Sequence, residues 1–186
     1  DESHSYEDLA GDLRSLIDRF GGFATIIGHS MGGKAAMALA LLHPECVRKL
    51  VVVDIAPVTY QQNQLDYIHA MESVNLDLVK TRKDFSKQLS NKIEDPMLRD
   101  FFTQSVNFSD HGRAEWFLNL SALKNNLSAI MSFPNLELRS LIQTLILRGG
   151  ISDYVLDEHR SVFERYFPNF KLETIQNAGH WPHVEN

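Results

Sequence analysis

The sequence predicts an α/β fold in which a mostly parallel sheet is covered by helices on both faces. Three observations indicate this class: short apolar runs without helical period, helical stretches between them, and a glycine-rich turn that joins one run to a helix. Short runs of branched residues are typical of buried parallel strands, which helices connect in this class. With 186 residues, 44% of them hydrophobic, the chain is long enough for one packed domain with a single core.

The first third of the chain contains two predicted strands and two predicted helices. Ser5 and Asp8 resemble a capping box, and the apolar period that follows predicts a helix as far as the glycines at 21–22. A buried strand is predicted at residues 23–27, followed by the glycine-rich turn and a helix that ends near His43. A second buried strand is predicted at residues 50–55 and is broken by a proline.

The middle of the chain has a different character. Residues 58–133 contain polar helical segments at 65–74 and 96–106, the latter with Asp95 as N-cap and Pro96 at the first helical position. No strong strand signal occurs there, so we expect a helical lid inserted into a core formed by residues 1–57 and 134–186. In the second part of that core the pattern predicts a strand at 144–147, a helix at 156–167 and a strand at 170–175.

The glycine-rich turn carries the most specific motif. Gly28-His29-Ser30-Met31-Gly32 follows an apolar strand and precedes a helix, as in the G-x-S-x-G nucleophile elbow. Gly28 and Gly32 are expected because a Cβ at either position would clash in so tight a turn. The N–H of Met31 starts the helix, where unpaired amides and the helix dipole favour an anion, so Met31 is a candidate oxyanion donor.

A serine nucleophile needs a histidine base and an acid that orients the base. His180 directly follows the last predicted strand and is our candidate base. Two acids remain open at this stage: Asp153, just past the penultimate strand, and Asp54, at the end of the strand after the nucleophile.

The same turn admits a second interpretation. Gly28, Gly33 and Lys34 satisfy G-x-x-x-x-G-K, and Asp54 could end a magnesium-binding strand as in P-loop NTPases. Ala35 argues against it, because a P-loop has a Ser or Thr hydroxyl there for the metal.

Composition excludes several other classes. The net charge of −6, without a basic cluster, argues against a nucleic-acid partner. No apolar run is long enough for a membrane span. His and Cys lack ligand spacing, so we expect neither a metal nor a cofactor, and the lone Cys46 fits a reducing compartment.

Three segments together resemble the α/β-hydrolase superfamily: residues 28–34, residues 52–57 (Val-Val-Asp-Ile-Ala-Pro) and residues 177–181 (Asn-Ala-Gly-His-Trp). More narrowly, they resemble the group of mitochondrial α/β-hydrolase domain-containing protein 11, small bacterial acyl esterases and fungal ethanol acetyltransferases. The resemblance implies Asp54 as the acid, with Asp153 in reserve, and an intracellular, mitochondrial location. It also implies that the chain is truncated at both ends, with an upstream loop supplying the second oxyanion donor.

Our hypothesis is a serine hydrolase that works through an acyl-serine intermediate. The resemblance implies short acyl esters or thioesters as substrates, and an alcohol acyltransferase as the alternative. The alternative hypothesis from another functional class is a binding or scaffold protein that keeps the fold but does not catalyse a reaction. Tyr60, Trp116 and Phe117, together with Leu65 and Ile68, are candidate acyl-pocket residues in the lid.

Overall fold

The computed structural model of the chain describes residues 3–61, 64–109 and 111–185. They form two compact units: residues 61–127 lie in the smaller one, and residues 4–60 and 128–186 make up the larger. Each unit has its own cluster of buried apolar side chains. The sequence predicts a single core, and that prediction is wrong because the segment of residues 61–127 is long enough to bury apolar surface by itself.

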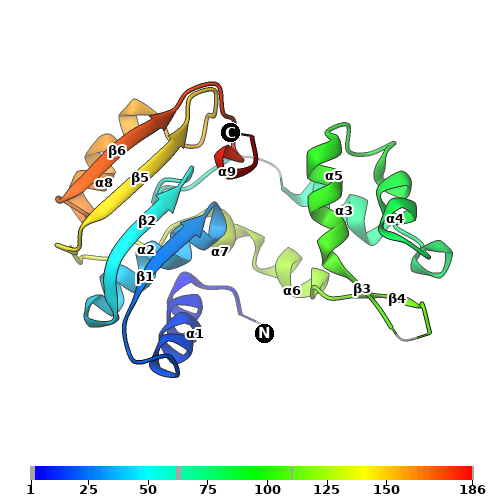
Figure 1. The fold of residues 1–186 in the computed structure, drawn as a ribbon, viewed down its shortest axis with the longest axis horizontal. Coiled ribbons are helices and arrows are strands. Elements are labelled where there is room, and N and C mark those ends of the chain that lie inside the picture. The colour runs from blue at the N-terminus through cyan, green and yellow to red at the C-terminus, as the bar shows by residue number, and fades with distance from the viewer. Residues whose placement is uncertain (1–2, 62–63, 110, 186) are drawn as a thin grey trace. The chain divides into compact units, whose positions relative to one another are not determined.

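A four-stranded parallel sheet forms the centre of the larger unit (Figure 1). Its strands are β1 (Ala24–His29), β2 (Val47–Val53), β5 (Thr144–Gly149) and β6 (Phe170–Ile175), in the spatial order β1-β2-β5-β6. All three neighbouring pairs are parallel, as predicted. β2 begins earlier than its apolar run, because exposed polar residues at its start still pair with β1.

Helices precede, connect and follow these strands along the chain. The three longer ones are α1 (Tyr6–Asp18), α2 (Met31–Leu42) and α8 (Arg160–Tyr166). The shorter ones are η1 (Pro44–Cys46), α7 (Leu127–Met131), η4 (Asp157–His159) and α9 (Pro182–Glu185). The predicted cap of α1 is confirmed, since the Ser5 side chain accepts a hydrogen bond from the Asp8 N–H. Within the described part of the chain, no helix has the length and apolarity that a membrane crossing requires.

One face of the sheet holds the core of this unit. Ile26, Val52 and Ile146 lie on that face and share a cluster with buried side chains of α1, α2 and α8. Ile27, one position along β1, points to the other face and is 71% exposed. The sequence predicts helices on both faces, whereas α1, α2 and α8 all pack against this one.

The smaller unit is mainly helical. Its elements are α3 (Leu65–Glu72), η2 (Leu76–Leu78), α4 (Arg82–Leu89), α5 (Pro96–Phe102), η3 (Thr103–Ser105), β3 (Val106–Phe108), β4 (Ala114–Trp116) and α6 (Leu120–Asn125). The predicted N-cap of α5 is confirmed, because the Asp95 side chain accepts from the Met97 N–H at 2.8 Å. The predicted lack of strands is wrong: β3 and β4 pair antiparallel, and the helix expected to reach residue 106 ends at Phe102. Strands of three residues are too short to show a clear alternation.

Candidate active site

Ser30 occupies the sharp turn between β1 and α2. Its backbone has a positive φ of 52°, which is unfavourable for a non-glycine residue. The surrounding chain imposes it: the Ser30 N–H donates to the Val53 carbonyl at 3.1 Å, and the Ser30 carbonyl accepts from Gly33 N–H at 2.8 Å. The turn therefore presents the serine hydroxyl at the carboxyl end of the sheet.

The glycines of this turn have different reasons to be there. A Cβ on Gly28 would lie 2.3 Å from the carbonyl oxygen of Gly32, so the expected clash at Gly28 is confirmed. At Gly32 nothing outside its own turn lies within 4 Å of an added Cβ, so the expected clash there is wrong. The second glycine that packing demands is Gly33, where a Cβ would meet an Ile55 methyl group at 2.6 Å.

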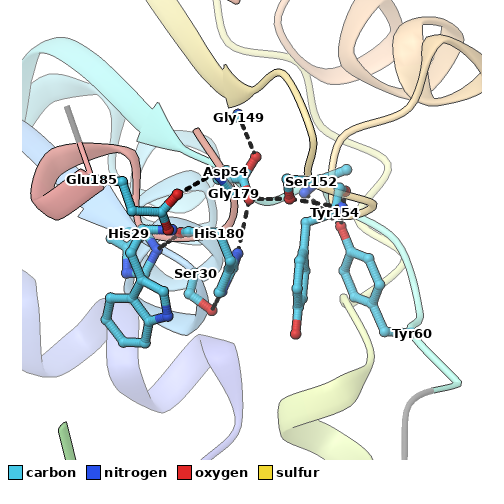
Figure 2. Close-up of polar contacts among 12 residues, drawn as sticks. His29, Ser30, Asp54, Tyr60, Gly149, Ser152, Tyr154, Gly179, His180 and Glu185 are labelled. Carbon is cyan, nitrogen blue, oxygen red and sulfur yellow. Dashed lines mark hydrogen bonds and ion pairs between the residues drawn. The ribbon is translucent and has the colours of Figure 1, made fainter. Parts of the chain in front are cut away.

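Ser30, His180 and Asp54 form one continuous chain of hydrogen bonds (Figure 2). The Nε2 atom of His180 lies 3.0 Å from Ser30 Oγ, and its Nδ1 atom lies 2.8 Å from Asp54 Oδ2. Because the carboxylate only accepts, Nδ1 carries the ring proton and Nε2 is left to accept from the serine hydroxyl. Three strand ends thus bring together side chains that lie up to 150 residues apart in the sequence.

Asp54 is fully buried and has three donors around its carboxylate. Gly149 N–H donates to Oδ1 at 2.8 Å, while the Ser152 hydroxyl and His180 Nδ1 both donate to Oδ2. A buried carboxylate needs such partners to remain charged. Ser152 was not among the predicted residues, although it lies in the loop that sequence analysis singled out for Asp153.

Asp153 itself lies elsewhere. Its side chain is exposed, and the acid that contacts the His180 ring is Asp54. The two candidates that the sequence leaves open are therefore separated by burial and by contact with the imidazole. Asp54 also has a positive φ of 49°, so strained backbone occurs at two members of the hydrogen-bonded chain.

Neighbouring residues enclose the imidazole of His180, and two of them, Tyr154 and Glu185, were not predicted from the sequence. The Tyr154 ring stacks on it, with centroids 3.7 Å apart and planes inclined by 20°. Behind it, His29 Nε2 donates to the His180 carbonyl at 2.7 Å, and burial lowers the pKa of His29, which favours the neutral ring. The Glu185 carboxylate accepts from Trp181 N–H at 3.1 Å and from Gly179 N–H. These contacts fix both the ring and the backbone on either side of it.

The remaining predicted residues fall into two groups. Met31 is the first residue of α2, so its N–H is one of those without an acceptor inside the helix. Tyr60 lies in the larger unit, where its hydroxyl accepts from Ala56 N–H at 2.8 Å and donates to the Tyr154 carbonyl at 2.6 Å. Trp116 and Phe117 belong to the smaller unit: Trp116 packs edge-on against a buried phenylalanine, and Phe117 is 68% exposed.

The P-loop interpretation has no support in this geometry. Lys34, which would have to reach a phosphate, is 1% exposed and donates to three backbone carbonyls. Asp54 has its carboxylate occupied by protein donors. Among the described residues, no group of three or more His, Cys, Asp or Glu side chains is placed to hold a metal ion.

The strand order, the elbow and the placement of Asp54 and His180 after the carboxyl ends of β2 and β6 define an α/β-hydrolase fold. A model of the alpha/beta hydrolase family matches residues 1–186, and the chain belongs to that family. The resemblance seen in the sequence is thereby confirmed.

Named relatives narrow the class. The chain is 40% identical to sn-1-specific diacylglycerol lipase ABHD11 of Mus musculus over 188 residues, which cover 97% of this chain and 61% of the mouse protein. It is 33% identical to esterase YbfF of Escherichia coli, over 97% of this chain and 70% of that protein. A solved marine microorganism esterase matches with a TM-score of 0.93 and 35% identity, over 100% of this chain and 74% of its own. The chain thus resembles esterases and lipases, and it spans 61% of the mouse relative's length.

Proposed function

We propose that this chain carries the acyl-transfer site of a serine esterase, with Ser30 as nucleophile, His180 as general base and Asp54 as the acid that orients His180. The observation that carries the proposal is the continuous hydrogen-bonded chain from Ser30 Oγ through the imidazole to the buried Asp54. A serine hydroxyl becomes a useful nucleophile only when a base removes its proton, and this arrangement supplies that base in the right tautomer.

The first half-reaction forms an acyl-serine. His180 Nε2 takes the proton from Ser30 Oγ as that oxygen attacks the carbonyl carbon of the ester. The resulting oxyanion accepts a hydrogen bond from the Met31 N–H at the start of α2, where the helix dipole favours negative charge. The imidazolium then gives its proton to the leaving alcohol as the carbon–oxygen bond breaks.

The second half-reaction releases the acyl group. A water molecule loses a proton to His180 as it attacks the acyl carbon, and Ser30 leaves with that proton restored. The products are a carboxylic acid and the free enzyme. Throughout, the Asp54 carboxylate accepts from His180 Nδ1–H and stabilises the transient imidazolium.

The substrate class we propose is a carboxylic ester or thioester with a short acyl chain, and acylglycerols belong in the first test panel. The names of the mouse and E. coli relatives support an ester substrate. We propose that residues 58–133 act as the lid and that Tyr60, which contacts the Tyr154 backbone beside His180, lines the acyl pocket of the larger unit. An alcohol in place of water at the second step would give the acyltransferase outcome.

The test is hydrolysis of short p-nitrophenyl esters, acyl thioesters and acylglycerols by the full-length protein, with and without an added alcohol. We expect hydrolysis that Ser30→Ala reduces at least about 10³-fold in kcat. Ester products formed with the alcohol would establish acyl transfer. If the folded wild type turns over none of these substrates, the result would support the scaffold hypothesis and contradict the esterase proposal.

A further inference from the structure

Lys34 is a buried cation that the proposed chemistry does not use. It lies on α2, four residues after Ser30, and is 1% exposed. Its Nζ atom donates to the carbonyl oxygens of Val58 at 2.8 Å, Met131 at 2.9 Å and Ser132 at 2.7 Å. An ammonium group has three N–H donors, so all of them are used by backbone carbonyls.

These three carbonyls come from two places in the chain that the inserted segment separates. Val58 lies just before residues 61–127, and Met131 and Ser132 lie just after them. The Tyr60 N–H also donates to the Met131 carbonyl at 3.0 Å, so the outgoing and returning chains are joined directly. We call residues 58–60 and 130–132 the stem.

Aromatic side chains complete the surroundings of the Lys34 ammonium group. Its Nζ lies 4.8 Å from the centroid of the Tyr60 ring and 5.7 Å from that of Tyr6, distances at which a cation is attracted to the ring face. The Tyr6 hydroxyl donates to the Ile130 carbonyl at 2.7 Å. Removing the amine would take the Lys34 donor from the partly buried carbonyls of Val58 and Ser132, which is costly, whereas the Met131 carbonyl would keep the Tyr60 N–H.

The stem leads to the catalytic histidine through two tyrosines. Tyr60 donates its hydroxyl to the Tyr154 carbonyl at 2.6 Å and accepts from Ala56 N–H at 2.8 Å. Tyr154 in turn stacks on the His180 imidazole, and Figure 2 shows the two tyrosines side by side. A shift of the stem would move Tyr60 and with it the ring that supports His180.

We propose that Lys34 is a positioning residue, which anchors both chains of the stem to the nucleophile helix and thereby, through Tyr60 and Tyr154, supports the imidazole of His180. The second half of this inference rests on the proposed function, whereas the anchoring does not. It also gives a physical reason for the lysine of the G-x-x-x-x-G-K pattern: its three N–H donors are taken by backbone carbonyls of its own chain, which leaves none for a phosphate.

The first test is hydrogen exchange of backbone amides in the full-length protein. Lys34→Met keeps the length of the side chain and removes its donors and charge; Lys49→Met, at an exposed position of β2, is the matched control. We expect stem amides, that of Tyr60 in particular, to exchange at least about tenfold faster in Lys34→Met, with β2 and β5 unchanged. Lys34→Gln retains two N–H donors, so its stem amides should exchange at rates between those of the wild type and Lys34→Met.

The second test is kinetic and separates positioning from general stability. We expect Lys34→Met to lower kcat about tenfold while KM stays within about twofold, because a displaced imidazole affects the chemical step rather than ground-state binding. Tyr60→Phe, which loses both hydroxyl contacts and keeps the ring beside Lys34, should lower kcat in the same way without loosening the stem amides.

Either test can overturn its part of the proposal. If Lys34→Met speeds amide exchange equally in the stem and in the sheet, Lys34 stabilises the whole unit and the anchoring of the stem is contradicted. If the lysine variants do not fold, the wild type decides: a Tyr60 amide that exchanges within seconds, while β2 amides stay protected, contradicts the anchor. An unchanged kcat in folded Lys34→Met contradicts the link to His180. If the wild type hydrolyses no substrate, the proposed function is contradicted, and the exchange data alone decide whether Lys34 anchors the stem.

Discussion

At the scale of single residues, the acid of the site is defined by burial and donors rather than by its position in the sequence. Asp54 is 0% exposed and accepts from a backbone N–H, a hydroxyl and the imidazole. Asp153 is exposed. An acid that orients a histidine has to hold one oxygen at a fixed place, and the surroundings of Asp54 provide that.

Asp54→Asn and Asp153→Asn test this assignment as a matched pair. We expect Asp54→Asn to lower kcat by about 10³–10⁴, because an amide cannot hold the His180 tautomer that accepts from Ser30. Asp153→Asn should leave kcat within about twofold, since an exposed side chain is replaced by one of the same shape. Steady-state hydrolysis of a p-nitrophenyl ester measures both. A severe loss in Asp153→Asn with a mild one in Asp54→Asn would reverse the assignment.

The elbow glycines give a second residue-scale prediction. Gly28→Ala should lower the free energy of unfolding by about 3 kcal/mol or more, because its Cβ would lie 2.3 Å from the Gly32 carbonyl oxygen. Gly32→Ala should change it by less than about 1 kcal/mol, since its Cβ meets open space and alanine favours the helix. Urea unfolding of the two variants compares them, and equal losses would contradict the packing argument.

At the scale of elements, the sequence predicts the strands and helix starts that depend on residues close together in the chain. The branched apolar runs identify all four strands of the parallel sheet, and Ser5 and Asp95 identify two helix starts. The strands β3 and β4 were not predicted because a run of three residues is too short to show a clear alternation of buried and exposed positions. Ser152 and Tyr154 were not predicted as site residues because their roles depend on contacts with residues far away in the sequence. Ser152 contacts a residue 98 positions away, and Tyr154 contacts one 26 positions away.

A second prediction at this scale concerns Lys34 on helix α2, whose contribution to stability should depend on pH. Burial lowers the pKa of Lys34 from 10.5 to about 7, and the groups facing it are the rings of Tyr6 and Tyr60 and three carbonyls. Between these two pKa values the unfolded lysine binds a proton that the folded one has lost, and the folded amine then has two N–H donors for the three carbonyls. Because the unfolded state binds more protons in this range, stability from this group rises as pH increases from about 7 to 10.5.

The measurement is the free energy of unfolding of wild type and Lys34→Met at several pH values. Their difference should shift in favour of the wild type above pH 7, by at most about 1.4 kcal/mol per pH unit. The same series on Lys49→Met controls for other titrating groups. A difference that stays flat from pH 7 to 9 would show that the carbonyls hold the lysine charged.

At the scale of the whole molecule, two separate cores predict two separate responses to a cavity. Phe85 lies in the core of the smaller unit and Phe163 in that of the larger, and both are almost completely buried. Truncation of such a side chain costs about 3–5 kcal/mol. Phe85→Ala should therefore speed amide exchange in α3–α6 while β2 and β5 stay slow, and Phe163→Ala should do the reverse. Uniform acceleration by both variants would mean that the chain has one cooperative core.

The central claim is that Ser30 is activated by His180, and a fluorophosphonate probe tests it most directly. Such a probe reacts with an activated serine hydroxyl, and peptide mapping by mass spectrometry locates the adduct. We predict a single adduct on Ser30 in the full-length wild type, with the labelling rate at least about 10³-fold lower in His180→Ala. A folded wild type with no adduct on Ser30, or a labelling rate that His180→Ala leaves unchanged, would contradict the claim.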